Sequence, residues 1–248
     1  LPAGYPGMTT FDEVDKMNTD RLKAVVQELM KNQGTYQKGT VEQKIADFYH
    51  TLLDMENRNK EGLKPLEKYL DLADSASTIQ ELLDATVLIE SETGMNPLLG
   101  FGPSTDLLDS NKYSLYGSGL STGLPRDYIL MGNPQVDAMY EGLVAQFLAL
   151  SGIPGEEAVE KAGKLYDLER IIAASTMSNE EASRVENVYN PVSRADLAKM
   201  FPYVDMGKYL DDLEYGSAKE IIVTDVNLMK KTGELLSDEN LDTLKTYV

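Results

Sequence analysis

Cysteine and tryptophan are absent from the 248 residues, and histidine occurs once. Without cysteine the chain forms no disulfide and offers no thiolate to a nucleophilic site, a zinc site or an iron–sulfur cluster. A single histidine also rules out H-E-x-x-H and other zinc sites that need two imidazoles from one chain. We therefore expect no catalytic residue, no metal ligand and no cofactor site within this chain.

Basic charge and long apolar runs are also scarce. Lys and Arg number 23 against 41 Asp and Glu, which gives a formal net charge of -18. Because attraction to phosphates supplies most non-specific nucleic-acid affinity, this balance argues against nucleic acid and anionic membranes as partners. The longest apolar run, residues 143–150, is interrupted by Gln146 and is far shorter than the ~18 residues of a membrane-spanning helix. The sequence predicts a soluble chain with no membrane-spanning segment.

The hydrophobic pattern is mostly helical. Apolar residues recur at spacings of three and four, and Ser77 with Gln80 resembles a capping box. The predicted longer helices cover residues 10–32, 40–57, 79–89, 134–150, 156–174, 204–213, 226–236 and 237–248. The chain is long enough for one large domain, so we expect a single lobe over residues 1–248.

Residues 95–131 differ from the rest, because Gly, Ser, Pro, Asn and Asp are frequent there. Only residues 112–116 alternate like a strand, which predicts an ordered connector or a small β-hairpin. Residues 221–223 form an isolated β-branched run. The predicted fold class is therefore mostly α: a multi-helix lobe with a short irregular or β-hairpin insert around 95–131.

His50 is the first of several candidate sites with an ordinary structural explanation. It lies between Asp47 and Asp54, a spacing that fits a general base oriented by a carboxylate but is common on helix surfaces, which we favour. No spacing singles out a pair of acids for glycoside hydrolysis.

Three further segments resemble binding motifs without completing them. Residues 57–62 imitate the first half of a calcium loop, yet Lys68 stands where a bidentate Glu is needed. Residues 117–123 are glycine-rich but lack the spacing and the Lys of phosphate-binding loops. Tyr113 and Tyr116 either line a groove or pack in a strand, and we favour packing. We expect turns at both glycine-containing segments.

The order of short motifs along the chain resembles the N-terminal half of the neprilysin-like zinc endopeptidases, which include endothelin-converting enzyme and bacterial oligopeptidase O. The most specific piece is Gly-Leu-Pro-Arg-Asp-Tyr at 123–128, one residue shorter than the family's Gly-Leu-Pro-x-Arg-Asp-Tyr-Tyr. The other matching pieces are Leu1-Pro2, residues 11–13, 43–49, 62–66, 166–173, 189–191, 197, 201–202, 222–223 and 243–247.

This resemblance implies a two-lobed peptidase, with a helical N-terminal lobe that covers a thermolysin-like lobe around a chamber for oligopeptides. The zinc ligands and the general base then lie downstream, in a C-terminal catalytic lobe absent from this chain. We expect the chain, which begins with Leu1, to be a fragment that is inactive alone. Its partners are then oligopeptide substrates and its own catalytic lobe, with zinc bound only in that lobe.

The resemblance also indicates two substrate-binding residues. Mammalian members of the family carry Arg-Tyr-Gly-x-Phe-Asp near the start of the lobe, and the corresponding run here ends in Phe11 and Asp12 but lacks the Arg. Phe11 and Asp12 are thus candidate substrate contacts, whereas a preference for peptide carboxylates does not carry over. Each residue also has a structural explanation, as a core residue and as an acid in a first helical turn.

Two alternatives remain open from the sequence. The chain is either the lid of a bacterial peptidase or a stand-alone helical domain that binds peptides or proteins without catalysis. A third hypothesis, an unrelated enzyme that uses His50 or an acid pair, is disfavoured. Frequent Asn, Ser, Thr and Tyr with no Cys favour an extracytoplasmic protein, although the resembled family also has cytoplasmic members.

Overall fold

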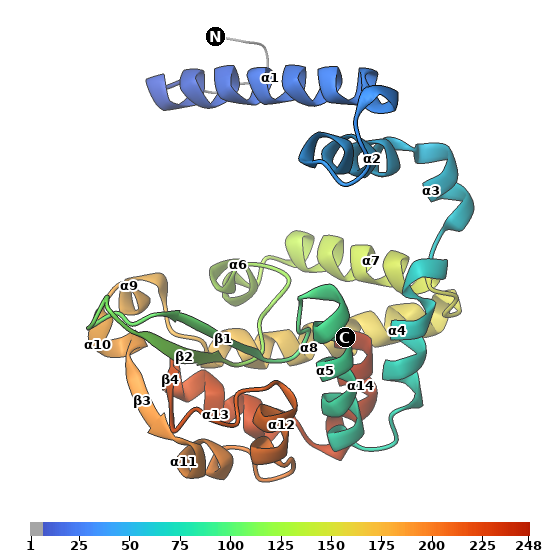
Figure 1. Ribbon diagram of the computed structural model, residues 1–248. Helices are drawn as coiled ribbons and strands as arrows, with labels where there is room; N and C mark the ends of the chain where they lie inside the picture. Colours follow the sequence, from blue (N-terminus) through green and yellow to red (C-terminus); the bar gives the residue numbers. More distant parts are fainter. Residues whose placement is uncertain (1–6) are drawn as a thin grey trace. The chain divides into compact units, whose positions relative to one another are not determined.

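A computed structural model of the chain describes residues 7–248 (Figure 1). Leu1 and Pro2 of the family pattern lie outside the described residues. The chain divides into two compact units, residues 1–65 and residues 66–248. The expectation of a single lobe over residues 1–248 stays a prediction.

The described part of the first unit is helical. Its elements are α1 (Thr10–Lys31), the 3-10 turn η1 (Gln33–Thr35), α2 (Val41–Leu53) and α3 (Met55–Glu61). Helices α1 and α2 pack against each other. No residue of α1 is fully buried within the chain, and Phe11, Leu22 and Val25 are 88%, 66% and 53% exposed. The apolar stripe that predicted this helix therefore remains largely uncovered.

The second predicted helix, over residues 40–57, is divided at Asp54. The Asp54 carboxylate accepts a hydrogen bond from the Asn57 backbone N–H at 3.0 Å, so that α3 begins there as a new helix. Gly62 ends α3 with a φ of 56°, a left-handed conformation that glycine adopts at little cost. The prediction of one continuous helix was wrong because Asp54 caps the backbone in mid-pattern.

The second unit contains the remaining helices. They are α4 (Lys64–Ser75), which begins at the boundary between the units, α5 (Ile79–Thr93), α6 (Arg126–Met131), α7 (Pro134–Leu150), α8 (Gly155–Ser175), α9 (Asn179–Ala182), α10 (Val185–Val188), α11 (Arg194–Lys199), α12 (Met206–Asp212), α13 (Val226–Leu235), the 3-10 turn η2 (Asp238–Asn240) and α14 (Leu241–Tyr247). The mostly helical fold class is confirmed.

A four-stranded sheet completes this unit, with the order β1-β2-β4-β3. Strands β1 (Gly100–Thr105) and β2 (Tyr113–Ser118) form an antiparallel hairpin, which confirms the predicted insert. The isolated β-branched run is strand β4 (Glu220–Val223), which pairs in parallel with β2 and antiparallel with β3 (Asn190–Ser193). Strand β3 contains Pro191 and lies at the sheet edge, where a missing N–H is tolerated.

Buried side chains lock the hairpin to its neighbours. Asp106, at the end of β1, is 3% exposed and accepts hydrogen bonds from the Ser114 hydroxyl at 2.6 Å and the Tyr189 hydroxyl at 2.9 Å. These bonds, with that of Ser114 the strongest, hold the pKa of Asp106 well below its usual range. Tyr113 is 77% exposed, so the packing role that we favoured for it is wrong, whereas the Tyr116 hydroxyl donates to the Thr105 carbonyl.

Helix α8 is the central element of the second unit. It contacts α6, α7, α13 and α14, and Figure 1 shows it between α7 on one side and α13 with α14 on the other. Leu168 and Ile172 join the main core, and Tyr166 and Ala173 join a smaller cluster with Ile129. Residues 66–248 therefore pack around α8.

The capping box predicted at the start of α5 was wrong. The N-cap is Thr78, whose hydroxyl accepts from the Glu81 N–H. The Glu81 carboxylate accepts from the N–H of Ser77, one residue before the N-cap, so neither Ser77 and Gln80 nor Thr78 and Glu81 form the reciprocal pair of a capping box. The C-terminal helix α14 packs within this chain, where Leu244 is fully buried in the core.

Between residues 7 and 248, each helix is too short or too polar to cross a bilayer.

Gly233 of α13 gives a direct test of this packing. A Cβ there would overlap the Met200 carbonyl and lie 3.1 Å from the Phe201 Cα. Because these are backbone atoms, we expect Gly233→Ala to lower the free energy of unfolding by about 3 kcal/mol or more. Urea unfolding followed by circular dichroism measures this.

Gly163 of α8 is the matched control, since a Cβ there meets nothing within 4 Å. Gly163→Ala should raise stability by up to ~1 kcal/mol through helix propensity. Equal effects of the two substitutions would contradict the close contact between α13 and residues 200–201.

Candidate functional site

The sequence-predicted substrate residues lie at the start of α1. Phe11 is 88% exposed, so the alternative of a core residue within this chain is wrong. The Asp12 carboxylate accepts hydrogen bonds from the Thr9 backbone N–H at 2.6 Å and from the Thr9 hydroxyl at 2.7 Å. These bonds lower the pKa of Asp12. Asp12 therefore caps the helix, and the role of both residues in substrate binding stays a prediction.

The remaining sequence candidates lie apart from one another. His50 is exposed on α2. Residues 57–68 fall mainly within α3 and α4, so they form helices and not a calcium loop. Residues 117–118 belong to β2, and residues 119–123 form the loop that follows. Among residues 7–248, no three His, Cys, Asp or Glu side chains are arranged to hold a metal ion.

The loop after β2, residues 119–125, contains the first three residues of the most specific family motif and is fixed by side chains from three helices. The Leu120 N–H donates to the Thr232 hydroxyl at 3.0 Å. The Ser121 N–H donates to the Tyr247 hydroxyl at 3.0 Å, and that hydroxyl donates back to the Ser121 carbonyl at 2.9 Å. The Gly123 N–H donates to Glu169 Oε1 at 2.9 Å. Helices α13, α14 and α8 thus hold the loop in place.

Glu169 is the most unusual group in this network. It is 3% exposed, and Oε1 accepts from both the Gly123 N–H and the Tyr140 hydroxyl, each at 2.9 Å. Within residues 7–248, Oε2 has no hydrogen-bond partner although it is buried. Burial therefore raises the pKa of Glu169 despite the two donors, and burial also raises the pKa of Tyr140. Tyr140 consequently remains a donor at neutral pH.

A second buried acid joins α7 to α8. Asp137 is 8% exposed and accepts from the Tyr166 hydroxyl at 2.6 Å and from Arg170 Nη2 at 2.8 Å. The Arg170 guanidinium also lies over the Tyr166 ring, 4.7 Å from its centroid. One face of α7 is thus fixed to α8 through polar contacts.

The opposite side of α7 exposes large apolar side chains. Met139, Leu143, Phe147 and Leu150 are 67%, 49%, 64% and 72% exposed. Their spacing of four, four and three places them on one face of the helix, which we call the α7 apolar face. Four large exposed apolar side chains on one helix face are a common feature of protein interaction surfaces.

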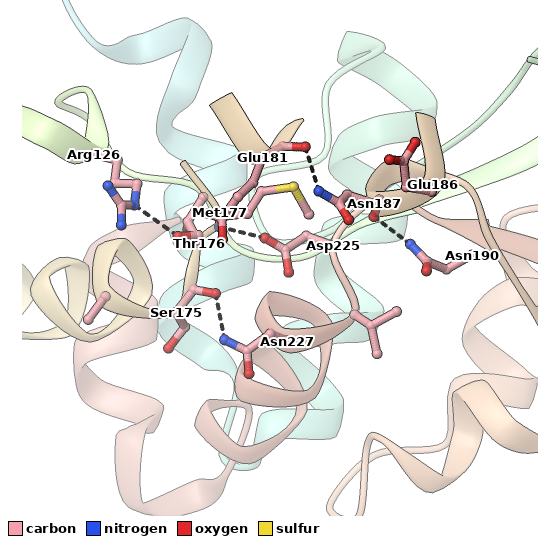
Figure 2. Close-up of a pocket in the computed structure, with 12 residues that line it drawn as sticks. Arg126, Ser175, Thr176, Met177, Glu181, Glu186, Asn187, Asn190, Asp225 and Asn227 are labelled. Atoms are coloured by element: carbon pink, nitrogen blue, oxygen red, sulfur yellow. Dashed lines mark hydrogen bonds between the residues drawn. The ribbon is translucent and has the colours of Figure 1, made fainter. Parts of the chain in front are cut away.

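A polar pocket of about 490 Å³ lies where α8 ends, and we call it the α8-end pocket (Figure 2). Its wall is built from residues that satisfy the last carbonyls of α8: Arg126 Nε donates to the Thr176 carbonyl at 2.9 Å, and Asn227 Nδ2 donates to the Ser175 carbonyl at 3.0 Å. Asp225 accepts from the Met177 N–H at 2.8 Å and from the Leu228 N–H at 2.9 Å, which caps α13. The pocket is therefore a rigid, hydrogen-bonded structure.

Sequence reasoning missed both Glu169 and the α8-end pocket. Glu169 appeared only as part of a family motif, and its burial depends on the loop that returns from β2. The pocket joins segments that are distant in the sequence: residues 126, 174–177, 181, 186, 187, 190 and 225–227. In the sequence, only Arg126 of the Gly-Leu-Pro-Arg-Asp-Tyr motif pointed to the residues of this pocket.

Comparison with known protein families gives a match over the whole chain. A family model described as peptidase family M13 matches residues 1–248. A putative zinc metalloproteinase of Streptococcus gordonii is 23% identical over 250 residues, which cover 98% of this chain and 44% of that protein. Endothelin-converting enzyme 1 of Mus musculus is 22% identical over 261 residues, which cover 100% of this chain and 33% of the enzyme. The chain thus spans less than half the length of these relatives.

Solved structures share the fold. The crystal structure of the Mycobacterium tuberculosis zinc metalloprotease Zmp1 with an inhibitor superposes with a TM-score of 0.79 at 23% identity, covering 92% of this chain and 36% of that one. The same protease in an open state gives a TM-score of 0.80 at 22% identity, over 94% of this chain and 37% of that one.

Glu169 generates a pH-dependent prediction. A folded-state pKa raised above the ordinary 4.5 means that the folded chain binds a proton more readily than the unfolded chain. Protonation of Glu169 stabilises the fold fully below the unfolded-state pKa, and this contribution is lost as the pH rises through the folded-state pKa. Wild type should therefore lose stability relative to Glu169→Gln between pH 4.5 and 7.5, as measured by urea unfolding at several pH values.

Glu169→Ala is the companion variant. It leaves the Gly123 N–H and the Tyr140 hydroxyl without an acceptor, and it should be about 1–3 kcal/mol less stable than Glu169→Gln at every pH, because neither variant titrates at this position. A stability difference between wild type and Glu169→Gln that does not change with pH would show that burial does not shift this carboxyl.

Proposed function

The chain belongs to peptidase family M13, and from this premise we propose that it is the N-terminal lobe of a zinc endopeptidase that cleaves oligopeptides. In the whole protein its role is to cover the active-site chamber and to control which substrates enter. The chain itself contributes no catalysis under this proposal.

The family assignment confirms the resemblance to neprilysin-like peptidases that the ordered motifs indicated. The match extends from residue 1 to residue 248, and the chain corresponds to the N-terminal region of longer relatives. It is the type of domain that precedes the remainder of an M13 zinc metallopeptidase. This position is the basis for assigning it a covering role.

The α7 apolar face is the observation that carries the proposal. Met139, Leu143, Phe147 and Leu150 remain 49% to 72% exposed although α7 is fixed to α8 by its other side. Exposure of four large apolar side chains on one helix face is unfavourable in water, by about 25 cal/mol for each Å² of apolar surface that could be covered. We propose that the catalytic lobe and bound peptides cover this face.

The zinc ion of the family has no suitable ligands here. Residues 7–248 offer no cluster of three His, Cys, Asp or Glu side chains, and the single histidine, His50, lies on the surface of α2. The donor groups of this chain therefore do not fit a catalytic zinc. We place the zinc and its ligands in the C-terminal catalytic lobe, outside this chain.

Phe11 and Asp12 are the substrate contacts that the family pattern supports. The Phe11 ring is exposed, and one oxygen of Asp12 serves the helix cap while the other accepts no hydrogen bond within residues 7–248. An apolar ring beside a carboxylate suits a peptide side chain and a backbone N–H. Because the Arg of the family pattern is absent, we propose no selection for peptide carboxylates.

A covering lobe limits substrates by size. A roof over the chamber admits flexible oligopeptides and excludes folded proteins, and it keeps bulk water from the reacting bond.

We further propose that the whole protein is a bacterial, extracytoplasmic peptidase. The composition that favours export, with no Cys and frequent Asn, Ser, Thr and Tyr, supports that location.

The α7 apolar face provides the test. In the full-length protein, Leu143→Gln combined with Phe147→Gln should lower the unfolding free energy by about 1–3 kcal/mol, because these side chains are buried against the catalytic lobe. The same substitutions in the 248-residue chain should change stability by less than about 0.5 kcal/mol, because they are exposed there. Chemical unfolding of both forms measures the difference.

Val159→Gln serves as the control, since it likewise replaces an exposed apolar side chain with glutamine, on α8 and outside the α7 apolar face, where Val159 is 64% exposed. It should alter neither form. Equal effects of the α7 substitutions on the chain and on the full-length protein would contradict a covering lobe at this face.

A further inference from the structure

We propose that the α8-end pocket binds an aliphatic cation, namely the guanidinium or ammonium group of an arginine, a lysine or a small amine. This inference concerns a pocket of the chain itself and does not depend on peptidase activity. The argument rests on the charges, the hydrogen-bond acceptors and the helix end that surround the pocket.

The charges of the lining favour a cation. Three carboxylates, those of Glu181, Glu186 and Asp225, line the pocket against one guanidinium, that of Arg126. Hydrogen bonds from Ser178 lower the pKa of Glu181, so this group is ionised at neutral pH. The Arg126 charge is partly offset by its ion pair with Asp127 at 2.7 Å. An anion would therefore meet a net repulsive surface.

The amide side chains of the lining use N–H groups on backbone carbonyls. Asn187 Nδ2 donates to the Glu181 carbonyl at 2.8 Å, Asn190 Nδ2 donates to the Val223 carbonyl at 3.0 Å, and Asn227 Nδ2 donates to the Ser175 carbonyl at 3.0 Å. Within residues 7–248, no hydrogen bond is donated to the three amide oxygens. These oxygens are therefore available as acceptors for a ligand that brings N–H groups.

Glu186 supplies the free charge of the pocket. Its side chain is exposed, and no hydrogen bond or ion pair engages its carboxylate within residues 7–248. Asp225, in contrast, uses both oxygens on backbone N–H groups. Glu186 is therefore the group best placed to form a charge-assisted hydrogen bond with an incoming cation.

The end of α8 adds to this preference. A helix of 21 residues ends at Ser175, and the partial negative charge at a helix C-terminus attracts cations. The Arg126 guanidinium already interacts with this negative end of α8, through its hydrogen bond to the Thr176 carbonyl. A pocket volume of about 490 Å³ is within the range of ~300–1,000 Å³ typical of small-ligand sites, which is ample for an alkyl guanidinium or ammonium.

Nuclear magnetic resonance titration of the complete 248-residue chain tests the proposal. The probe is N-acetyl-arginine N-methylamide, and the neutral control is the citrulline analogue, which has nearly the same shape. The arginine probe should shift the backbone amide signals of Met177, Asn187 and Asn227 saturably. The citrulline analogue should bind at least about 10-fold more weakly, because it makes no charge-assisted hydrogen bond.

Substitution of Glu186 identifies the site. Glu186→Gln should weaken binding of the arginine probe about 3- to 10-fold, and the exposed position leaves the fold intact. Glu239→Gln makes the same charge change outside the pocket lining and should change affinity less than 2-fold at 0.15 M salt, where charges are screened beyond about 8 Å.

n-Butylguanidine, a small cation with the same guanidinium and the same single charge, distinguishes the source of the cation. Tighter binding of the blocked arginine supports a peptide side chain, and tighter binding of n-butylguanidine supports a small free cation; both support the cation site. Equal binding of the citrulline analogue, shifts scattered over the acidic surface, or an unchanged affinity in Glu186→Gln would overturn the proposal.

Discussion

The burial of α8 is the constraint on which residues 66–248 depend. A helix that contacts α6, α7, α13 and α14 cannot present a single apolar stripe, because neighbours approach it from several sides. Small residues, Ala158, Ala162 and Ala173, are buried where these neighbours pack closely. The position of every surrounding helix is therefore fixed relative to α8.

Burial from several sides also places polar groups of α8 away from water. Glu169 accepts two hydrogen bonds and fixes the loop after β2, while Tyr166 and Arg170 bind Asp137 of α7. These contacts engage the polar side chains of α7 with α8, so that the apolar face of α7 points outward. The contacts of α8 thus explain both the hydrogen-bonded polar groups of the interior and the outward apolar face of α7, which we assign to contact with a second lobe.

The end of α8 accounts for the α8-end pocket. Arg126 and Asn227 donate hydrogen bonds to the carbonyls that α8 leaves without partners at its C-terminus, and these side chains form part of the pocket wall.

The sequence predicted the features that depend on local pattern. Helical periodicity located most helices, and the turn-rich segment at 95–131 predicted the hairpin. The errors at Asp54 and Thr78 arose because more than one residue was a suitable cap, and local pattern does not decide between them. The ordered motifs identified the family, since order along a chain carries information that single motifs lack.

Features that join distant segments were beyond sequence reasoning. The parallel pairing of β2 with β4 joins residues about 106 positions apart, as in Leu115 with Ile221, and short apolar runs do not specify such partners. The unpartnered oxygen of Glu169 and the acceptors of the α8-end pocket likewise exist only once α6, α8, α10 and α13 are assembled. Phe11 and Asp12 rest on the family pattern, and their exposure is compatible with contact to a peptide.

The most direct measurement compares peptide hydrolysis by the full-length protein with hydrolysis by the 248-residue chain, both supplied with zinc. One substrate is a free oligopeptide, and the other is the same sequence held in the surface loop of a folded protein. The account predicts cleavage of the free peptide by the full-length protein alone, with the folded protein left intact. Zinc-dependent cleavage by the 248-residue chain, or equal cleavage of both substrates by the full-length protein, would contradict a non-catalytic covering lobe.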